Sequence, residues 1–496
     1  MIHRSRLLRL LSVIALLNLS SWFVQAPVAF AREHSWLADA NTQIIVLRDA
    51  RVDFALRVAA IEQAKQSIDS ATYVQDMTSD SGLPLMKAFR DAQNRGIQGR
   101  YIVERSGSLR ADLRNRFENF LTDPDLARVP EVVSFGFHNL IPGLRWTDMM
   151  HEKILIIDGG TPDEKIWIGG RNNSKDSIHY LDVAFIMRPI IPGKPYLGDQ
   201  IREAYESLFQ ITQRISGLAT TRKHRKFVDK RLLWTSTRDQ ILQNERRTLD
   251  FERIQAVLSQ PVLEVSPEHP LLDTESRLNG PARLISNDFL SHILTGDYGR
   301  HISNREHLPS DIDRVAGEMI SHARTVYLAA MSVRLPVDIN QGLNQALDHH
   351  AEIHLLTNSA ETHRTLVPGG APYFLGIRQM LELLERSPQM HIHLLNEKLL
   401  KAREEYDQYN YQHTKLLIAD DQVMLGSDNF NDTSRTNNDE MVVQIRDAQF
   451  ASNLKAVLQE EIDDVYTTLD TDTARREAGR NNIFKRWINR ILLPIY

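Results

Sequence analysis

The 496-residue chain has no cysteine, which excludes disulfide bonds, thiolate metal sites and a cysteine nucleophile. Neither charge dominates: 59 Lys and Arg stand against 64 Asp and Glu, and a formal net charge of −5 is not typical of a general nucleic-acid-binding protein. With 23 Gly and 19 Pro, the chain is neither collagen-like nor of low complexity. Its length and its 42% hydrophobic content are enough for two or three domains, each with its own core.

The first 31 residues have the three parts of a secretory signal. Arg4, Arg6 and Arg9 precede an apolar run at 10–24, and Ala29-Phe30-Ala31 has the small–x–small pattern of a cleavage site. The run is shorter than the about 20 apolar residues that a membrane-spanning helix needs. We therefore predict export and cleavage after Ala31, which places the mature protein in the periplasm or at a membrane of the bacterial envelope. An uncleaved anchor is the alternative.

The rest of the chain consists of two similar halves in which helical and strand-like patterns alternate, and this predicts an α/β fold with helix-covered sheets. In the first half, the expected elements are helix, strand, helix and strand at 52–68, 70–74, 83–95 and 98–104. In the second half, the same order is expected at 312–323, 325–331, 342–350 and 352–357.

A proline-rich stretch separates the two halves and indicates a connector. Its prolines are Pro261, Pro267, Pro270 and Pro281. The predicted organisation is a signal peptide at 1–31, domains at 32–264 and 284–470, a connector at 265–283 and a tail at 471–496.

The decisive pattern occurs once in each half. The segments His151–Asp158 and His413–Asp420 both read His-x-Lys-x4-Asp, and both are apolar, strand-like runs that end in turn residues. Alternation along a strand places the histidine and the lysine of each segment on one face. One accidental match is expected at only about a few hundredths per chain, so two matches at corresponding places of a duplicated chain are a strong signal.

Each motif is followed by a second strand-like run that ends in small and amide residues. These endings are Gly169-Gly170-Arg171-Asn172 and Gly426-Ser427-Asp428-Asn429. Small residues let a backbone or a ligand oxygen approach closely, and asparagine is a neutral donor. Asp182 and Glu440 lie 31 and 27 residues after the two motif histidines, and such an acid could orient an imidazole through its second ring nitrogen.

These residue types suit a phosphate ester. Two lysines and two asparagines supply donors for phosphoryl oxygens. Two histidines allow one to attack phosphorus while the other protonates the leaving alcohol and then activates the incoming water or alcohol. No carboxylate cluster requires a metal, so we expect neither metal nor cofactor, with the lysines doing the work of a cation.

The motifs resemble those of the phospholipase D superfamily, with both of its HKD motifs. The segments 169–183 and 426–440 are similar to those that follow the motifs in bacterial cardiolipin synthases. The resemblance implies two α/β lobes, each a mixed sheet flanked by helices, related by a pseudo-twofold axis around one active site. It also implies a covalent phosphohistidine and no metal.

The resemblance implies a role for each residue. His151 is the expected nucleophile and His413 the expected acid and base, while Asp158 and Asp420 are expected to support the architecture of the motifs. The expected catalytic set is His151, Lys153, Asp158, Asp182, His413, Lys415, Asp420 and Glu440. The expected substrate-binding set is Gly170, Asn172, Ser427 and Asn429, with the two lysines also binding the phosphoryl group.

Two positions and the N-terminus depart from the family pattern. Asp428 stands where the family often has an apolar residue, and Asn431 where it often has aspartate. A signal-like segment replaces the N-terminal membrane hairpin of longer cardiolipin synthases. These departures leave the acceptor alcohol and the substrate open.

The C-terminal tail predicts membrane contact. Six basic residues and one acid lie within 475–490, a composition that suits an amphipathic helix on an anionic bilayer. A helix docked on the protein's own core is the alternative. The apolar residues that share one helical face are Ile483, Phe484, Trp487, Ile488, Ile491 and Leu492.

Two other clusters have a structural interpretation. Without a matching set of carboxylates, the histidines at 349–354 and 391–393 are expected to be surface and core residues rather than metal ligands. Tyr406, Tyr409 and Tyr411 precede the second motif, where they could line a substrate entrance or simply pack.

The sequence thus predicts a membrane-associated, monomeric phospholipase D-type enzyme whose halves form a pseudo-dimer. It would hydrolyse a phospholipid or transfer its phosphatidyl group to an alcohol such as phosphatidylglycerol. A nuclease of the superfamily is the first alternative, although removal of the signal leaves a formal charge of −8, which disfavours nucleic-acid binding. A non-catalytic lipid-binding protein is the second.

Overall fold

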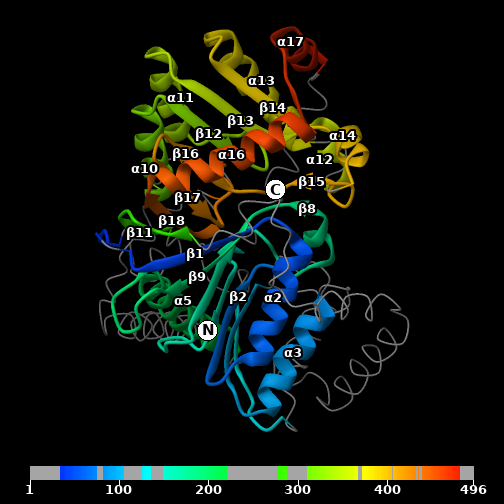
Figure 1. Ribbon diagram of the computed structural model, residues 1–496. Coiled ribbons are helices and arrows are strands. Elements are labelled where there is room, and N and C mark those ends of the chain that lie inside the picture. Colours follow the sequence, from blue (N-terminus) through cyan, green and yellow to red (C-terminus); the bar gives the residue numbers. More distant parts are fainter. Residues whose placement is uncertain are drawn as a thin grey trace, which may run out of the picture.

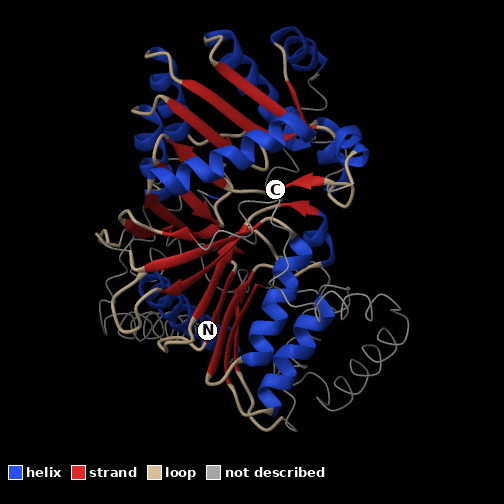
Figure 2. Ribbon diagram, in the orientation of Figure 1, coloured by secondary structure: helices blue, strands red, loops and turns tan. Residues whose placement is uncertain are grey.

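Two lobes, one above the other in Figures 1 and 2, make up the part of the chain that the computed structural model describes. The described residues are 34–74, 82–104, 126–135, 149–220, 276–287, 310–366, 371–404 and 406–480, without 39, 432, 433 and 435–437. The predicted signal, most of the predicted connector and the tail beyond residue 480 lie outside these residues.

The first lobe is built on an eight-stranded mixed sheet in the order β10-β1-β9-β7-β6-β2-β3-β4. One face is covered by α2 (Ala50–Gln63) and α3 (Gly82–Asn94), and the other by α5 (Leu197–Thr220). The strands are β1 (Thr42–Leu47), β2 (Ser67–Thr72), β3 (Gln98–Glu104), β4 (Glu131–Phe135), β6 (Ile154–Ile157), β7 (Lys165–Gly169), β9 (Ala184–Pro189) and β10 (Ser276–Arg277).

The second lobe repeats this arrangement in a nine-stranded sheet, with eight strands in the order β11-β18-β17-β16-β12-β13-β14-β19 and a short ninth, β5 (Met149–Met150), beside β18. The other strands are β11 (Ala282–Asn287), β12 (Thr325–Ala329), β13 (Glu352–Asn358), β14 (Met390–Leu395), β16 (Leu416–Ala419), β17 (Gln422–Gly426), β18 (Asn438–Arg446) and β19 (Tyr466–Thr468). The helices are α10 (Asp311–Ser321), α11 (Val337–Asp348), α12 (Ala360–Leu366), α13 (Ala371–Arg386), α14 (Glu397–Ala402), α16 (Ala448–Val465) and α17 (Thr471–Arg480).

The two lobes share one strand order. The series β1-β9-β7-β6-β2-β3-β4 in the first sheet corresponds to β11-β18-β17-β16-β12-β13-β14 in the second. The motif strands β6 and β16 lie at the centre, where both faces are covered, and this is why every one of their residues is apolar. The predicted fold class, two α/β lobes with mixed sheets flanked by helices, is confirmed.

A single hydrophobic core joins the lobes. Ile154 and Ile156 of β6 face α5, while Leu416 and Ile418 of β16 face α16, and all four belong to one continuous buried cluster. Alternate residues of the same strands, such as Leu155 and Leu417, face separate outer clusters. The inner helix α16 is the orange-red helix across the middle of Figure 1.

The chain crosses between the sheets near the predicted connector. β10 pairs with β1 of the first sheet, whereas β11 pairs with β18 of the second, so the change of sheet falls between residues 277 and 282. Residues just after the predicted signal also reach the second sheet, because His34 N–H donates to Leu284 O at 3.0 Å and Leu37 N–H to Ala282 O at 2.9 Å.

Helix α2 ends earlier than its apolar spacing predicts. The pattern extends to residue 68, but the helix ends at Gln63 and β2 begins at Ser67. Asp158 accepts hydrogen bonds from the backbone N–H groups of 65–67, so a contact distant in sequence ends the helical turn. The other elements of this pattern lie within a few residues of their expected positions, except that α11 begins five residues early, after Pro336.

The first ten residues of the predicted tail form α17, which packs on the second lobe. Ala474 and Ala478 are buried in its outer core, and Tyr373 of α13 donates a hydrogen bond to Glu477. This part of the tail is docked on protein. Among the described residues, no helix is both long and apolar enough to cross a bilayer.

Candidate active site

Both motif histidines lie at the seam between the lobes. The predicted strands are shorter than the motifs, because β6 begins at Ile154 and β16 at Leu416 and the preceding residues are extended without belonging to the central sheets. The backbone of each histidine instead bonds across the seam: His151 N–H donates to Asp439 O at 3.0 Å, and His413 N–H donates to Leu181 O at 2.8 Å.

Short parallel strand pairs surround these bonds. Just before His151, β5 pairs with the beginning of β18, and just before His413, β15 (Tyr411–Gln412) pairs with β8 (Tyr180–Leu181). Each motif therefore lies beside the strand of the other lobe that holds or leads to its acid, Glu440 or Asp182.

The acids pair crosswise with the histidines. His151 Nδ1 lies 2.8 Å from Glu440 Oε1, and His413 Nδ1 lies 2.7 Å from Asp182 Oδ2. Along the sequence each acid follows the histidine of its own half, but in the structure it contacts the histidine of the other half. All four side chains are buried. Neither lobe alone could orient its own histidine in this way.

Neighbouring groups keep the carboxyl groups of Asp182 and Glu440 ionised. Burial opposes the charge of Asp182, but Lys415 and His413 hold the pKa of its carboxyl below the ordinary value. Burial also opposes the charge of Glu440, and His151 holds its pKa below the ordinary value. Each ionised carboxylate accepts a hydrogen bond from Nδ1–H, which leaves the lone pair of each ring on Nε2.

Burial keeps both rings neutral. It lowers the pKa of His151, and burial together with Lys415 lowers the pKa of His413 to about 3. Lys415 Nζ lies 3.0 Å from His413 Nδ1, but that nitrogen cannot accept a hydrogen bond while it donates to Asp182. Lys415 donates to the backbone oxygen of His413 at 2.6 Å instead.

The motif lysines share this buried environment. Burial lowers the pKa of Lys153 to about 7 and that of Lys415 to about 8, although neighbouring carboxylates oppose the shift. Each lysine lowers the pKa of the histidine in the other motif, so the four groups act on one another. Tyr73 lies beside Lys153, whose Nζ is 5.3 Å from the centroid of the Tyr73 ring.

The motif aspartates have a different role. Asp158 and Asp420 occupy the far ends of the motif strands, with positive φ values of 52° and 53°. Asp158 accepts hydrogen bonds from the backbone N–H groups of 65–67, and Asp420 from those of 324 and 325. They tie the motif strands to β2 and β12, which is the architectural role expected for them.

Glycine at position 170 permits a close contact. A Cβ there would lie 2.7 Å from Asp182 Oδ1 and 3.0 Å from Lys415 Cδ. Ser427 stands at the corresponding place in the second lobe, and its hydroxyl donates to Glu440 Oε2 at 2.6 Å. Ser427, expected to bind substrate, therefore contacts the acid, as does Asn438, whose Nδ2 donates to Glu440 Oε1 at 3.0 Å.

Asn172 and Asn429 lie beside these contacts and are 7% and 6% exposed. The side-chain oxygen of each has no hydrogen-bond partner among the described residues. That oxygen can only accept a hydrogen bond, so the donor for a phosphoryl oxygen would be the Nδ2 group of the same amide. Both thus remain predicted ligands of a phosphoryl group.

The chain is similar in sequence to one protein family and in structure to several solved proteins. The family model described as cardiolipin synthase, PLD-like domain, matches residues 317–462. A phosphatidylserine synthase from Haemophilus influenzae Rd KW20 has a similar structure, with a TM-score of 0.57 at 11% identity over 92% of this chain and 95% of that chain. Residues 317–462 therefore match a phospholipase D-like domain, and the whole chain shares its fold with this synthase.

Two further structures are similar at TM-scores below 0.5. They are a polyphosphate kinase from Porphyromonas gingivalis (0.40, 14% identity, 84% of this chain and 50% of that chain) and NucT from Helicobacter pylori (0.26, 18% identity, 36% of this chain and 97% of that chain). No curated protein sequence matches the chain. Of these three structures, the synthase is the one whose TM-score supports an argument about the fold of this chain.

Sequence reasoning missed a buried ionic network behind Asp182. Arg171 is fully buried, and its guanidinium donates to Asp53 Oδ2 at 2.8 Å and to the backbone oxygen of Asp182 at 2.6 Å. Arg57 makes a second, two-pronged pair with Asp53. The Asp53–Arg57 spacing of four residues on a predicted helix was a signal available in the sequence. Arg171 gave no such signal.

The second lobe has Asp428 where the first has Arg171. Asp428 is fully buried, and its Oδ1 accepts a hydrogen bond from Phe430 N–H at 2.6 Å. Burial, together with Glu440 and Asp313, raises the pKa of Asp428 well above its ordinary value. The two halves of this phospholipase D-like protein therefore hold their acids by different means.

The remaining histidine cluster is a stack of side chains on the second sheet. His354 Nδ1 lies 3.1 Å from His393 Nε2, and the His354 ring stacks on Tyr327 with a centroid distance of 4.5 Å. Within the described ranges, no group of three or more His, Asp or Glu side chains could hold a metal ion.

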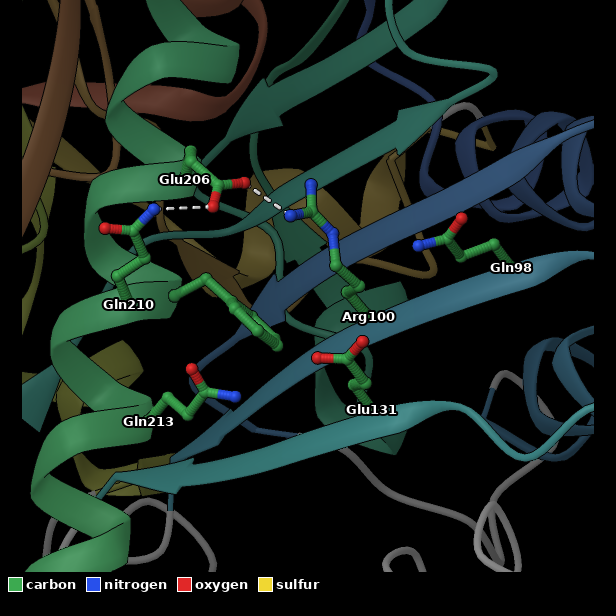
Figure 3. A pocket seen from close by; sticks show the side chains of 7 residues that line it. Gln98, Arg100, Glu131, Glu206, Gln210 and Gln213 are labelled. Atoms are coloured by element: carbon green, nitrogen blue, oxygen red, sulfur yellow. Dashed lines mark hydrogen bonds and ion pairs between the residues drawn. The ribbon is translucent and has the colours of Figure 1, made fainter.

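A separate pocket of about 400 Å³ opens beside β3, β4 and α5. Figure 3 shows its polar lining, in which Glu206 bonds to Arg100 and accepts a hydrogen bond from Gln210 at 2.9 Å. None of the predicted site residues lines this pocket. It is therefore distinct from the histidine site.

Proposed function

We propose that this protein is a phospholipase D-type phosphodiesterase or phosphatidyltransferase that acts on phospholipids through a covalent phosphohistidine. The observation that carries the proposal is the crossed pair of dyads, His151 with Glu440 and His413 with Asp182, with a motif lysine beside each histidine. A carboxylate at Nδ1 keeps the lone pair on Nε2, as required for attack on phosphorus or for proton transfer.

The first step forms one bond and breaks another. His151 Nε2 attacks phosphorus, and the bond between phosphorus and the leaving alcohol breaks as His413 donates a proton to the alcohol oxygen. His413 is neutral in the empty site, but a phosphodiester brings a negative charge that offsets the two lysines and raises the proton affinity of the imidazole. Substrate binding thus favours the protonated form of His413, which acts as the acid.

The second step reverses these roles. His413, now neutral, takes a proton from water or an alcohol, whose oxygen attacks the phosphohistidine, and the bond between phosphorus and His151 breaks. Throughout, Lys153, Lys415 and the amides of Asn172 and Asn429 are placed to hold the non-bridging oxygens. With water as acceptor the product is phosphatidic acid, and with phosphatidylglycerol it is cardiolipin.

The proposal also specifies the substrate, which is a phospholipid. It is supported by the family model, whose description names cardiolipin synthase, and by the export signal predicted at 1–31. The formal charge of −8 after removal of that signal disfavours nucleic acid as the substrate. We propose accordingly that the protein works at a membrane of the bacterial envelope, which the basic tail beyond residue 480 helps it to contact.

The test uses purified residues 32–496 on vesicles of phosphatidylglycerol and phosphatidylethanolamine, with and without EDTA, and with plasmid DNA in parallel. We expect lipid conversion in EDTA and a loss of about 10³-fold or more in His151→Ala and His413→Ala. The ratio of phosphatidic acid to cardiolipin then separates hydrolase from synthase. Cleavage of DNA without lipid conversion would replace the lipid proposal with a nuclease.

A further inference from the structure

The segment that leads to His413 is bound to the first lobe. Asn410 N–H donates to His179 O at 2.9 Å, and His179 Nδ1 lies 2.9 Å from Gln408 O. The three tyrosines of this segment are buried in the seam, so they pack between the lobes rather than line an entrance. They are Tyr406, Tyr409 and Tyr411, exposed by 4%, 6% and 1%.

Arg48, between β1 and α2, is the charged centre of this seam. Its Nη2 donates to Tyr406 Oη at 3.0 Å and to Glu461 Oε1 of α16 at 2.8 Å, and its Nε donates to the same carboxylate oxygen at 3.1 Å. The side chains of Arg48 and Glu461 are only 12% and 4% exposed. A buried, charge-assisted fork of this kind has a defined geometry, unlike a surface ion pair.

The backbone of Arg48 reaches the other member of the dyad. Arg171 Nη2 donates to Arg48 O at 3.0 Å and to Asp182 O at 2.6 Å, and Asp182 in turn holds His413 Nδ1 at 2.7 Å. The turn that carries Arg48 is thus connected to the His413 segment through Tyr406 and to Asp182 through Arg171.

The other dyad is supported differently. Glu440, which pairs with His151, receives hydrogen bonds from Ser427 and Asn438 of its own lobe. In the part of the chain that the structure describes, Arg48 contacts Tyr406, Glu460 and Glu461 and, through its backbone oxygen, Arg171. No hydrogen bond or ion pair joins these described residues to His151 or Glu440. A disturbance at Arg48 should therefore affect the two histidines unequally.

We propose that Arg48 is a positioning residue that couples lobe contact to the orientation of His413. Its guanidinium fixes the second-lobe segment that carries His413, while its carbonyl fixes Arg171 and through it Asp182. The inference rests on the proposed function in one respect, the assignment of proton transfer to His413. It predicts that loss of the Arg48 fork impairs leaving-group protonation more than nucleophilic attack.

The variants are Arg48→Lys, which keeps the charge but loses the fork, Arg48→Ala, and Glu461→Gln, which keeps the shape of the partner without its charge. Arg403→Ala is the matched control, because Arg403 pairs with Asp464 on the same helix α16 at 2.7 Å but is 55% exposed and has no link to Arg171. If Arg48→Ala does not fold, the two conservative variants decide the question.

The kinetic readout compares two diesters in the first turnover. A phospholipid needs a proton on its leaving alcohol, whereas p-nitrophenolate leaves bis(p-nitrophenyl) phosphate without one. We expect Arg48→Lys and Glu461→Gln to slow the lipid reaction by about tenfold or more and the nitrophenyl reaction by less than about threefold, since general-acid help matters only for the poorer leaving group. Arg403→Ala should leave both rates unchanged.

The second readout needs no activity. Histidine-labelled protein is compared by NMR, with the His413 signal assigned from His413→Asn, and we expect the ring Nδ1–H of His413 to shift in the Arg48 variants while that of His151 does not. Equal loss on both diesters with an unshifted His413 ring would overturn the proposal and make Arg48 a purely structural residue. If the wild type cleaves neither diester, the proposed function fails, and the NMR comparison still decides the role of Arg48.

Discussion

At the scale of single residues, burial governs the charge of the two motif lysines. Lys153 and Lys415 are only 4% and 3% exposed, and both have a lowered pKa because water cannot stabilise their positive charge. The carboxylates of Asp182 and Glu440 oppose this effect without cancelling it. Both lysines are thus charged below neutral pH, and they lose that charge as the pH rises.

The alkaline pH dependence should follow Lys153. Its pKa of about 7 means that the free enzyme loses this charge as the pH rises through 7, so kcat/KM for a diester should fall there. In Lys153→Arg the guanidinium stays charged, and the fall should move toward the pKa of Lys415, about 8. The measurement is kcat/KM between pH 5 and 9; an unchanged alkaline limb would exclude Lys153 as its source.

The free energy of unfolding should rise over the pH range in which kcat/KM falls. The unfolded chain keeps a lysine proton up to about pH 10.4, whereas folded Lys153 releases its proton near pH 7. Since the unfolded state then binds more protons, Lys153 makes the protein more stable as the pH rises through this range. Urea unfolding of the wild type against Lys153→Met, whose side chain does not titrate, measures the difference, and a slope of the other sign would contradict it.

Gly170→Ala should impair catalysis through Asp182. The added methyl group would lie 2.7 Å from the Asp182 carboxylate, which must move away from His413, and a displacement of this size costs about 10²-fold in kcat. Gly479→Ala in α17 is the control, because a Cβ there meets nothing within 4 Å. A kcat within twofold of the wild type would mean that the Asp182 contact is not needed.

At the scale of elements, each motif divides into two parts with different tasks. The first three residues are extended and bond across the seam, while the remaining residues form a central strand that ends in an aspartate with positive φ. That aspartate joins the strand to the turn between a helix and the neighbouring strand, β2 or β12. The aspartate that holds the strand in place and the histidine proposed to act on the substrate thus lie at opposite ends of each motif.

Asp158→Ala should therefore lower stability more than activity. Three buried or half-buried backbone N–H groups would lose their acceptor, which costs about 1–3 kcal/mol. Urea unfolding measures the loss, and kcat of the folded fraction should stay within about threefold because Asp158 does not touch the histidines. Asp163→Ala, which removes an exposed pair with Lys65, is the control and should change little. Unchanged stability with lost activity would make Asp158 catalytic.

At the scale of the whole molecule, the lobes are parts of one unit. A continuous core runs from α5 of the first lobe to α16 of the second, and parallel strand pairs link each motif to the opposite lobe. The crossed dyads follow from this arrangement, because the strand beside each histidine belongs to the other half. Duplication has produced a site that neither half completes alone.

The crossing makes a specific prediction for two variants. Asp182→Asn should change the ring titration of His413 in the second lobe and leave His151 nearly unchanged, while Glu440→Gln should do the reverse. Histidine NMR across pH 3 to 8 measures both rings in each variant. A change confined to the histidine of the same half would contradict the crossed arrangement.

Much of the fold and the chemistry could be predicted because the signals are local. Apolar periodicity located the repeated helix–strand pattern, and the two His-x-Lys-x4-Asp segments pointed to side chains that the structure brings together. The predicted end of α2 was wrong because the carboxylate of Asp158, about 90 residues away, ends that helix. The placement of His151 and Lys153 on a strand was also wrong, since β6 begins only at Ile154 and the backbone N–H of His151 bonds to the opposite lobe.

By itself, the sequence determined which chemical groups are present, that they occur twice, and that they adjoin strands of an α/β fold, because spacing along a chain reports local geometry directly. Only the tertiary structure decided which acid pairs with which histidine and that Ser427 donates a hydrogen bond to Glu440. It also decided that Arg171 links Arg48 to Asp182, the partner of His413. These contacts join residues up to 413 positions apart. They depend on how two sheets pack against each other, and no local pattern contains that information.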